Sequence, residues 1–237
     1  MKIGILCALE RELAPFLPWI KDEYIHEKAM LTVHEGMIEG IETAVLFSGV
    51  CKVNAAIAAQ MLINICACDA IIVSGTAGGV DERLRVYDTV VSTEVAYHDV
   101  AHGILTEYHP WMPSIYFQAD TKLVQLAMRI FNQTDKPGNI YAGRIVTGEQ
   151  FIDKETYPAI QTEYAPLCVD METASVAHVC YVNSIPFVAI RTITDVTSED
   201  DANAFEVNCD DAAKISADIV RQMLRMMKTE SESVQEA

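Results

Sequence analysis

Basic residues are scarce in this chain of 237 residues, because 17 lysines and arginines stand against 34 aspartates and glutamates, a formal net charge of -17. A surface of that sign repels nucleic-acid phosphates and anionic lipid head groups. We therefore expect neither a nucleic-acid nor a membrane partner. A small-molecule partner is favoured, but only weakly, since many cytosolic proteins are acidic.

Long hydrophobic runs are also missing. The apolar run at the N-terminus, Ile3 to Ala8, is too short for a signal sequence and leads straight into charged residues. The longest apolar stretch, Ala55 to Ala70, is interrupted by Gln60, Asn64 and Asp69, which makes it too short and too polar to span a bilayer. We expect no membrane span and a cytoplasmic location.

Several signatures of specialised chemistry are absent as well. The seven cysteines form no CxxC pair, and the six histidines form neither an HExxH motif nor another metal-ligand spacing. There is no GxSxG nucleophile motif. The glycine-rich segment SGTAGG, residues 74–79, matches neither a dinucleotide-binding loop nor a triphosphate-binding loop. We expect buried, reduced thiols and no metal or cofactor.

What the chain does contain is an alternation of strand and helix patterns, with 51% hydrophobic residues. This predicts an α/β fold, a single domain over residues 1–228 with a central, largely parallel or mixed β-sheet flanked by helices. A polar tail, 229–237, is expected to be frayed. The predicted strands are 3–8, 30–38, 41–47, 70–73, 86–97, 140–146, 167–169 and 185–193, and the predicted helices are 9–20, 54–68, 121–131, 173–181 and 210–227.

Reactive residues follow four of the predicted strands. They are Glu12, the glycine-rich segment SGTAGG at 74–79, the pair Met171–Glu172, and Asp195. Ligands of open α/β sheets bind beyond the carboxyl ends of the strands. Three carboxylates and one glycine-rich loop are therefore candidates to converge on one crevice.

Each of these features also has an ordinary structural explanation. Glu12 and Glu172 stand at predicted helix starts, where the helix dipole favours acids. The glycine-rich segment suits a tight turn. Asp195 suits a helix N-cap as well as a desolvated proton donor. Asp170 and Glu172 are two residues apart, so their side chains are expected to diverge.

Taken together, the segments carry more information than any one of them. They are KIGILCALERE, SGVCKVNAA, SGTAGGV, VSTEVAYHD, TGEQFI, VDMETASVAHVC and PFVAIRTITD, followed by the region of Phe205. In this order and spacing, over about residues 1–228, the chain resembles the 5'-methylthioadenosine/S-adenosylhomocysteine nucleosidases of the nucleoside phosphorylase and hydrolase superfamily. The resemblance implies a nucleoside phosphorylase-like fold, a homodimer and no cofactor. It also implies hydrolysis of adenosine thioethers to adenine and a 5-substituted ribose, with 5'-deoxyadenosine as a further candidate substrate.

The resemblance implies a catalytic role for four residues. Glu12 matches the glutamate that positions and activates the attacking water, and Arg191 matches an arginine beside it. Glu172 matches the glutamate that grips the ribose hydroxyls. Asp195 matches the acid that protonates purine N7. These roles suit the chemistry, because a purine leaves poorly as an anion and nearby carboxylates favour an oxocarbenium-like ribose.

The same resemblance implies the residues that surround the substrate. Phe151 is expected to stack on the purine, and the Ile152 backbone to read the edge of the base. Phe205 matches a mobile residue near the sugar and the base. The full set of implied substrate-binding residues is Leu9, Val50, Thr76, Ala77, Gly78, Phe151, Ile152, Met171, Thr194 and Phe205.

Departures from the family pattern are mostly mild. Thr76 and Thr194 replace serines, Gly148–Glu149 replaces a Gly-Asp pair, and Leu9 replaces a methionine. Residues 100–117 (VAHGILTEYHPWMPSIYF) depart further, because the better-known members have a more apolar loop that helps enclose the 5'-thioalkyl group across the dimer interface. The intruding residues are His102, His109 and Trp111. We hypothesise that the base is still adenine but that the 5' side favours another group.

Two alternative functions remain open at this stage. A purine nucleoside phosphorylase shares the fold but must bind phosphate, usually with several arginines, and the acid Glu12 would then stand where the anion binds. The candidate arginines are Arg11, Arg83, Arg85 and Arg191. A non-catalytic nucleoside-binding module would keep Phe151 and the glycine-rich segment but would not need the acids.

Overall fold

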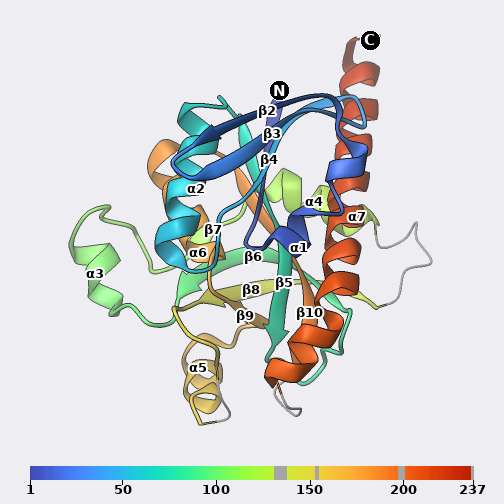
Figure 1. Cartoon of the computed structure of the whole chain (residues 1–237). Helices are drawn as coiled ribbons and strands as arrows, with labels where there is room; N and C mark the ends of the chain where they lie inside the picture. The colour runs from blue at the N-terminus through green and yellow to red at the C-terminus, as the bar shows by residue number, and fades with distance from the viewer. Residues whose placement is uncertain (131–137, 153–154, 197–200, 236–237) are drawn as a thin grey trace.

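The alternation of strands and helices predicted from the sequence is present in the computed structural model, which describes residues 1–130, 138–152, 155–196 and 201–235 (Figure 1). The strands are β1 Lys2–Cys7, β2 Lys21–Lys28, β3 Leu31–Ile38, β4 Ile41–Phe47, β5 Ala70–Gly79, β6 Thr89–Tyr97, β7 Phe117–Gln118, β8 Ile140–Thr147, β9 Cys168–Asp170 and β10 Phe187–Val196. The helices are α1 Glu10–Leu13, the 3-10 turn η1 Leu17–Trp19, α2 Lys52–Asn64, α3 His102–Glu107, α4 Thr121–Ile130, α5 Tyr157–Tyr164, α6 Thr173–Asn183 and α7 Asp201–Gln235.

The strands described form one mixed sheet in the order β10-β6-β8-β9-β5-β1-β4-β3-β2, with β7 paired to β6. β1 pairs in parallel with β4 and β5, whereas β2, β3 and β4 form an antiparallel meander. β10 also pairs with β5, so that β5, β10, β6, β8 and β9 close into a ring. The predicted class, an α/β fold with a central mixed sheet, is confirmed.

Helices cover both faces of the sheet, and each face has its own apolar core. Ile71 and Val73 of β5 face α2 and α6, which contribute small side chains such as Ala58 and Ala177. Ile72, the residue between them, belongs to the other core, together with α4 and α7. Successive strand residues point to opposite faces, so a strand buried on both sides appears in the sequence as a continuous apolar run.

The glycine-rich segment corrects a prediction, because it is a strand rather than a loop. β5 continues through Gly79 and pairs in parallel with β10 from Phe187↔Ile71 to Val196↔Gly79. β10 likewise continues through Asp195. Strand ends that border a pocket instead of the core need no large apolar side chains, so their hydrophobic pattern stops before their hydrogen bonding does.

The last helix is much longer than the predicted 210–227. α7 begins at Asp201 and continues to Gln235, so residues 229–235 of the expected frayed tail are helical. There is no glycine or proline between 201 and 235 to end the helix. Salt bridges Lys228–Glu232 (3.2 Å) and Arg129–Glu230 (2.6 Å) add modest support to this last part.

The sequence patterns also missed the elements β2, α3, β7 and α5. β2 is mostly exposed, with charged residues on both sides, so it carries little apolar signal. Six of the seven free cysteines are buried, and Cys51 is half-buried. Among the helices described, none has the length and apolar character needed to cross a membrane.

Candidate active site

A cavity of about 190 Å³ lies where β1, β5, β9 and β10 end. Every substrate-binding residue predicted from the sequence lines it, and so do the catalytic candidates Glu12, Glu172 and Asp195. Arg191 is fully buried behind the lining. The prediction that the strand-end residues converge on one crevice is therefore confirmed. The lining residues that the sequence did not single out as binding residues are Ala8, Gly79, Val80, Gln150, Val169 and Asp170.

Glu12 is held at one end of this cavity by four hydrogen bonds. Its Oε2 accepts from the backbone N–H groups of Ala8 (2.8 Å) and Leu9 (3.0 Å). Its Oε1 accepts from the N–H and the hydroxyl of Thr76, at 2.8 and 2.9 Å. A Cβ at Gly75 would stand only 2.5 Å from Oε1, so glycine is what allows the carboxylate to approach β5 so closely.

Glu172 lies directly after β9 and is oriented through both of its oxygens. Oε1 accepts from the Cys51 N–H at 2.9 Å, and Oε2 accepts from Arg191 Nη2 at 3.2 Å. Burial raises the pKa of Glu172 to about 7; Arg191 opposes that rise, and the nearby charge of Asp170 adds to it. A carboxyl with such a pKa changes its charge near neutral pH.

Arg191 joins two carboxylates that the sequence suggested would diverge. Asp170 Oδ2 lies 2.9 Å from Arg191 Nε, and Glu172 contacts the same guanidinium. Burial alone would lower the pKa of Arg191, but the neighbouring carboxylates outweigh it and raise that pKa further. Asp170 also accepts hydrogen bonds from the hydroxyls of Thr147 and Thr173. The expected divergence was wrong, because a strand-to-helix turn around one long guanidinium lets both acids reach it.

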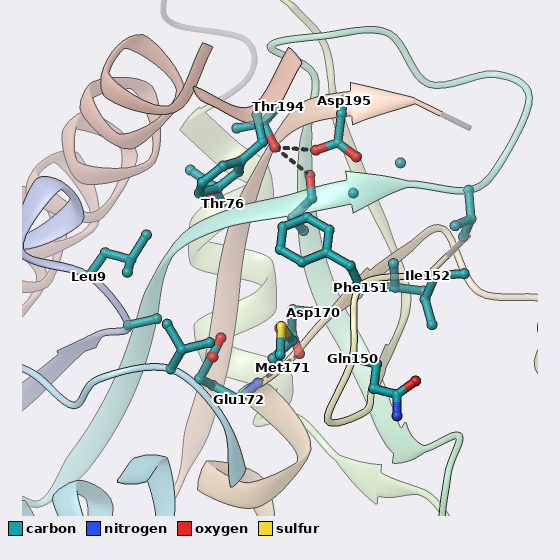
Figure 2. Close-up of a pocket in the computed structure, with 18 of the residues that line it drawn as sticks. Leu9, Thr76, Gln150, Phe151, Ile152, Asp170, Met171, Glu172, Thr194 and Asp195 are labelled. Atoms are coloured by element: carbon teal, nitrogen blue, oxygen red, sulfur yellow. Dashed lines mark hydrogen bonds between the residues drawn. The ribbon is translucent and has the colours of Figure 1, made fainter. Parts of the chain in front are cut away.

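Asp195 lies at the other end of the cavity, as the penultimate residue of β10. It is buried, and its Oδ1 accepts a hydrogen bond of 2.6 Å from the Thr194 hydroxyl (Figure 2). A Cβ at Gly78 would meet Asp195 Oδ2 at 3.1 Å. The strand pairing Asp195↔Gly78 therefore places a carboxylate against a residue without a side chain.

An aromatic side chain separates these two acidic ends. Figure 2 shows Phe151 and Met171 between Asp195 on one side and Glu172 on the other. Phe151 is 61% exposed and meets Phe205 edge-to-face, with ring centroids 5.9 Å apart. A partly exposed aromatic ring beside a buried acid suits a flat heteroaromatic ligand that accepts a proton.

Residues 100–117, the segment that departs most from the family pattern, do not reach this cavity. None of them is among the described residues that line it. Leu105 and Met112 pack into the core, whereas Ile104, Tyr108 and Trp111 are exposed. Any influence of this segment on a ligand in the same chain is therefore indirect.

One group of possible metal ligands lies elsewhere, within the residues described. The ligand atoms of His26, Glu35 and Cys66 are all within 4.8 Å of one another. Glu35 is hydrogen-bonded to His26 at 2.7 Å and also accepts from the Lys2 ammonium. β2 and β3 lie at the opposite end of the sheet order from β10, so this group takes no part in the pocket.

Comparison with known proteins identifies the family of the chain. The family model of the Phosphorylase superfamily matches residues 2–225. The 5'-methylthioadenosine/S-adenosylhomocysteine nucleosidase of Actinobacillus succinogenes is 36% identical over 94% of this chain and 98% of its own. The chain therefore belongs to the Phosphorylase superfamily and, within it, to the family of 5'-methylthioadenosine/S-adenosylhomocysteine nucleosidases.

Solved structures extend the comparison. The nucleosidase from Colwellia psychrerythraea 34H, in complex with adenine, is 33% identical with a TM-score of 0.87, over 94% of each chain. The futalosine hydrolase of Helicobacter pylori strain 26695 is 28% identical with a TM-score of 0.84, over 94% of this chain and 97% of that one. Hydrolases with different substrate names thus share this fold.

Proposed function

We propose that this protein hydrolyses the N-glycosidic bond of adenosine thioethers, such as 5'-methylthioadenosine and S-adenosylhomocysteine, to adenine and the 5-substituted ribose. The single observation that carries the proposal is the arrangement of one cavity, with Glu172 at one end, Asp195 at the other and Phe151 between them. Glu12 also lines the cavity, and its charge acts on Glu172. That arrangement suits a nucleoside whose sugar faces the first end and whose base faces the second.

Each end then has a defined part in the reaction. Asp195 donates a proton to N7 of the purine, so that the base leaves as neutral adenine when the bond from N9 to C1' breaks. Glu12 accepts a proton from the water whose oxygen forms the new bond to C1'. Phe151 stacks on the base, and the backbone of Ile152 reads its edge.

The ribose is held by the residues after β9. Glu172 accepts hydrogen bonds from the ribose hydroxyls as a carboxylate, and Met171 packs along the sugar. Arg191 keeps Glu172 oriented. It also balances part of the negative charge of Glu12, Asp170 and Glu172. The remaining wall is formed by Leu9, Val50, Thr76, Ala77, Gly78, Thr194 and Phe205.

The hydrogen bonds of Glu12 favour hydrolysis over phosphorolysis. A phosphate would need donors in this part of the pocket, but two N–H groups before α1 and both donors of Thr76 already bind the Glu12 carboxylate. An incoming phosphate dianion would find those donors occupied and would be repelled by a buried negative charge. A neutral water molecule is not repelled and does not need those donors.

The test is adenine release from 5'-methylthioadenosine, followed by chromatography in phosphate-free buffer and again with phosphate added. We expect adenine and free 5-methylthioribose in both buffers at similar rates. Release that requires phosphate and yields a ribose 1-phosphate would establish a phosphorylase. Tight binding without adenine in either buffer would favour a nucleoside-binding module.

The preferred 5' group is a separate part of the proposal. Residues 100–117 do not line the cavity of their own chain, but in the family the corresponding loop helps enclose the 5' group across the dimer interface. Since this segment carries histidines and a tryptophan in place of a more apolar loop, we expect a preference that differs from the family's. Relative kcat/KM values for 5'-methylthioadenosine, S-adenosylhomocysteine and 5'-deoxyadenosine measure it. Clear dominance of the two thioethers would contradict this expectation.

We further propose that the chain forms a homodimer. Large apolar side chains are exposed on α2, on α3 and in the segment that follows it, and at the end of α6, and they are suited to burial against a second copy. They include Val53, Ile57, Ile104, Trp111 and Val182. Light scattering after size exclusion should give twice the mass of one chain, and a single-chain mass would rule the dimer out.

A cytoplasmic location completes the proposal. Its support is the set of free thiols, since reduced cysteines are typical of the cytosol. Fractionation of cells that express the intact protein would test it, and recovery outside the cytosol would contradict it.

A further inference from the structure

The segment between β4 and α2 holds one residue in an unusual backbone conformation. Cys51 has φ 81° and ψ 165°, a region that glycine adopts freely and other residues avoid. Such a conformation persists only where the surroundings hold the backbone firmly. Hydrogen bonds to the two peptide groups on either side of Cys51 hold its backbone in this conformation.

The first peptide group, between Val50 and Cys51, is held from both sides. The Asn54 side-chain amide donates to the Val50 carbonyl at 2.8 Å. The Cys51 N–H donates to Glu172 Oε1 at 2.9 Å. A peptide group is planar, so the hydrogen bond that orients the carbonyl also sets the direction of the N–H.

The second peptide group, between Cys51 and Lys52, is held by Glu149. The Lys52 N–H donates to Glu149 Oε1 at 3.1 Å, and the Cys51 thiol is hydrogen-bonded to the same carboxylate. Glu149 is itself tied to Asp99, which accepts from the Glu149 N–H at 3.0 Å. The Lys52 ammonium lies 2.9 Å from Asp99 and balances these acids.

We propose that Asn54 and Glu149 are positioning residues for ribose recognition, because together they fix the Cys51 N–H that orients the Glu172 carboxylate. Arg191 directs one oxygen of Glu172 and the Cys51 N–H directs the other. Neither Asn54 nor Glu149 lines the cavity described above, so both act through the strained residue between them. The inference rests on the proposed role of Glu172 as the acceptor of ribose hydroxyls.

The sharpest variant is Asn54→Asp, which keeps the shape of the side chain but removes its donor. Residue 54 lies in the first turn of α2, where an acid is favoured by the helix dipole, so the protein should remain folded. The readout is the ratio of kcat/KM for 5'-methylthioadenosine to kcat/KM for its 2'-deoxy and 3'-deoxy analogues. We expect this ratio to fall by about tenfold, as for the loss of a hydrogen bond to a charged group.

Glu149 is tested by a pair of variants. Glu149→Ala should lower the same ratio, and Glu149→Gln should restore most of it, because the amide oxygen still accepts from the Lys52 N–H. Glu27→Ala, an exposed glutamate on β2, is the matched control and should leave the ratio unchanged. A purely structural role would slow all three substrates equally and leave the ratio intact.

The outcomes separate this inference from the function on which it rests. If the unmodified protein does not distinguish the deoxy analogues, the role of Glu172 is wrong and the inference falls with it. If it distinguishes them and Asn54→Asp and Glu149→Ala do so equally well, only the positioning role is overturned. A reduced ratio in both variants, with recovery in Glu149→Gln, supports it.

Discussion

The two ends of the pocket are built differently. At the sugar end, Glu12, Glu172 and Arg191 are at most 4% exposed, and their partners come from β5, β9, β10 and the segment before α2. At the base end, Phe151 is 61% exposed and its ring contact within the described residues is with Phe205. One end is an ordered charge network, and the other is an open aromatic surface beside a single buried acid.

The difference follows from what each end must hold. Buried charges are costly unless they are paired and hydrogen-bonded, so the sugar end needs partners from several strands at once. A flat base needs apolar area and one proton donor, and the ring that provides the area must leave room for entry.

The largest effect is expected at the base end, for Asp195→Asn. Asparagine keeps the size of the side chain but cannot protonate N7, so kcat should fall by about 10²–10⁴. Adenine release from 5'-methylthioadenosine measures it, with binding of the nucleoside checked by calorimetry. A loss of less than about threefold in kcat would remove Asp195 from the role of acid.

The largest effect on stability is expected at the sugar end, for Arg191→Met. This change leaves Asp170 and Glu172 buried without their guanidinium, so the free energy of unfolding should fall by about 3–5 kcal/mol. Urea denaturation measures it. Arg83→Met is the control, because the Arg83 side chain is 67% exposed and solvent screens its pair with Asp81, so the loss should be much smaller. Equal losses in the two variants would contradict the contrast.

The third effect is a pH dependence caused by Glu172. Its pKa is raised from 4.5 to about 7 by burial, so the stabilising preference for the protonated form is fully present below pH 4.5 and is lost as the pH rises to 7. Glu172→Gln does not titrate. The free energy of unfolding of Glu172→Gln should therefore rise relative to that of the unmodified protein between pH 4.5 and 7, by on the order of 1–3 kcal/mol. Denaturation at several pH values measures the difference, and a difference that stays constant would show that burial does not control this carboxyl.

The smallest effect is expected from the aromatic surface. Phe151→Ala should raise KM by about fivefold, since a stacked ring contributes about 1 kcal/mol, and kcat should change little. Phe205→Ala removes the edge-to-face neighbour of Phe151 and part of the cavity wall but leaves the stacking ring in place, so it should raise KM less. Steady-state kinetics with 5'-methylthioadenosine measures both. A larger fall in kcat than rise in KM for Phe151→Ala would mean that the ring acts in the chemical step.

The strand cores were predictable because their signal is local. The run Ile71–Ile72–Val73 is apolar on both faces, and the structure uses it that way. The extensions of β5 and β10 were not predictable, because Gly78 and Asp195 pair as strand residues beside a pocket that has no hydrophobic signal. The edge strand β2 was missed for a related reason, since both of its sides are polar and exposed.

Local patterns in the sequence predict the α/β class, the order of the core strands and helices, and the acids that follow the strands, because each depends on residues close together in the chain. The elements β2, α3, β7 and α5 are not among those predicted. Three sets of contacts depend on the tertiary fold. Asp170 and Glu172 meet on Arg191, Thr76 gives both of its donors to Glu12, and Cys51 presents its N–H to Glu172. These contacts join residues up to 121 positions apart. Their geometry depends on strand register and on one strained peptide, which no local pattern specifies.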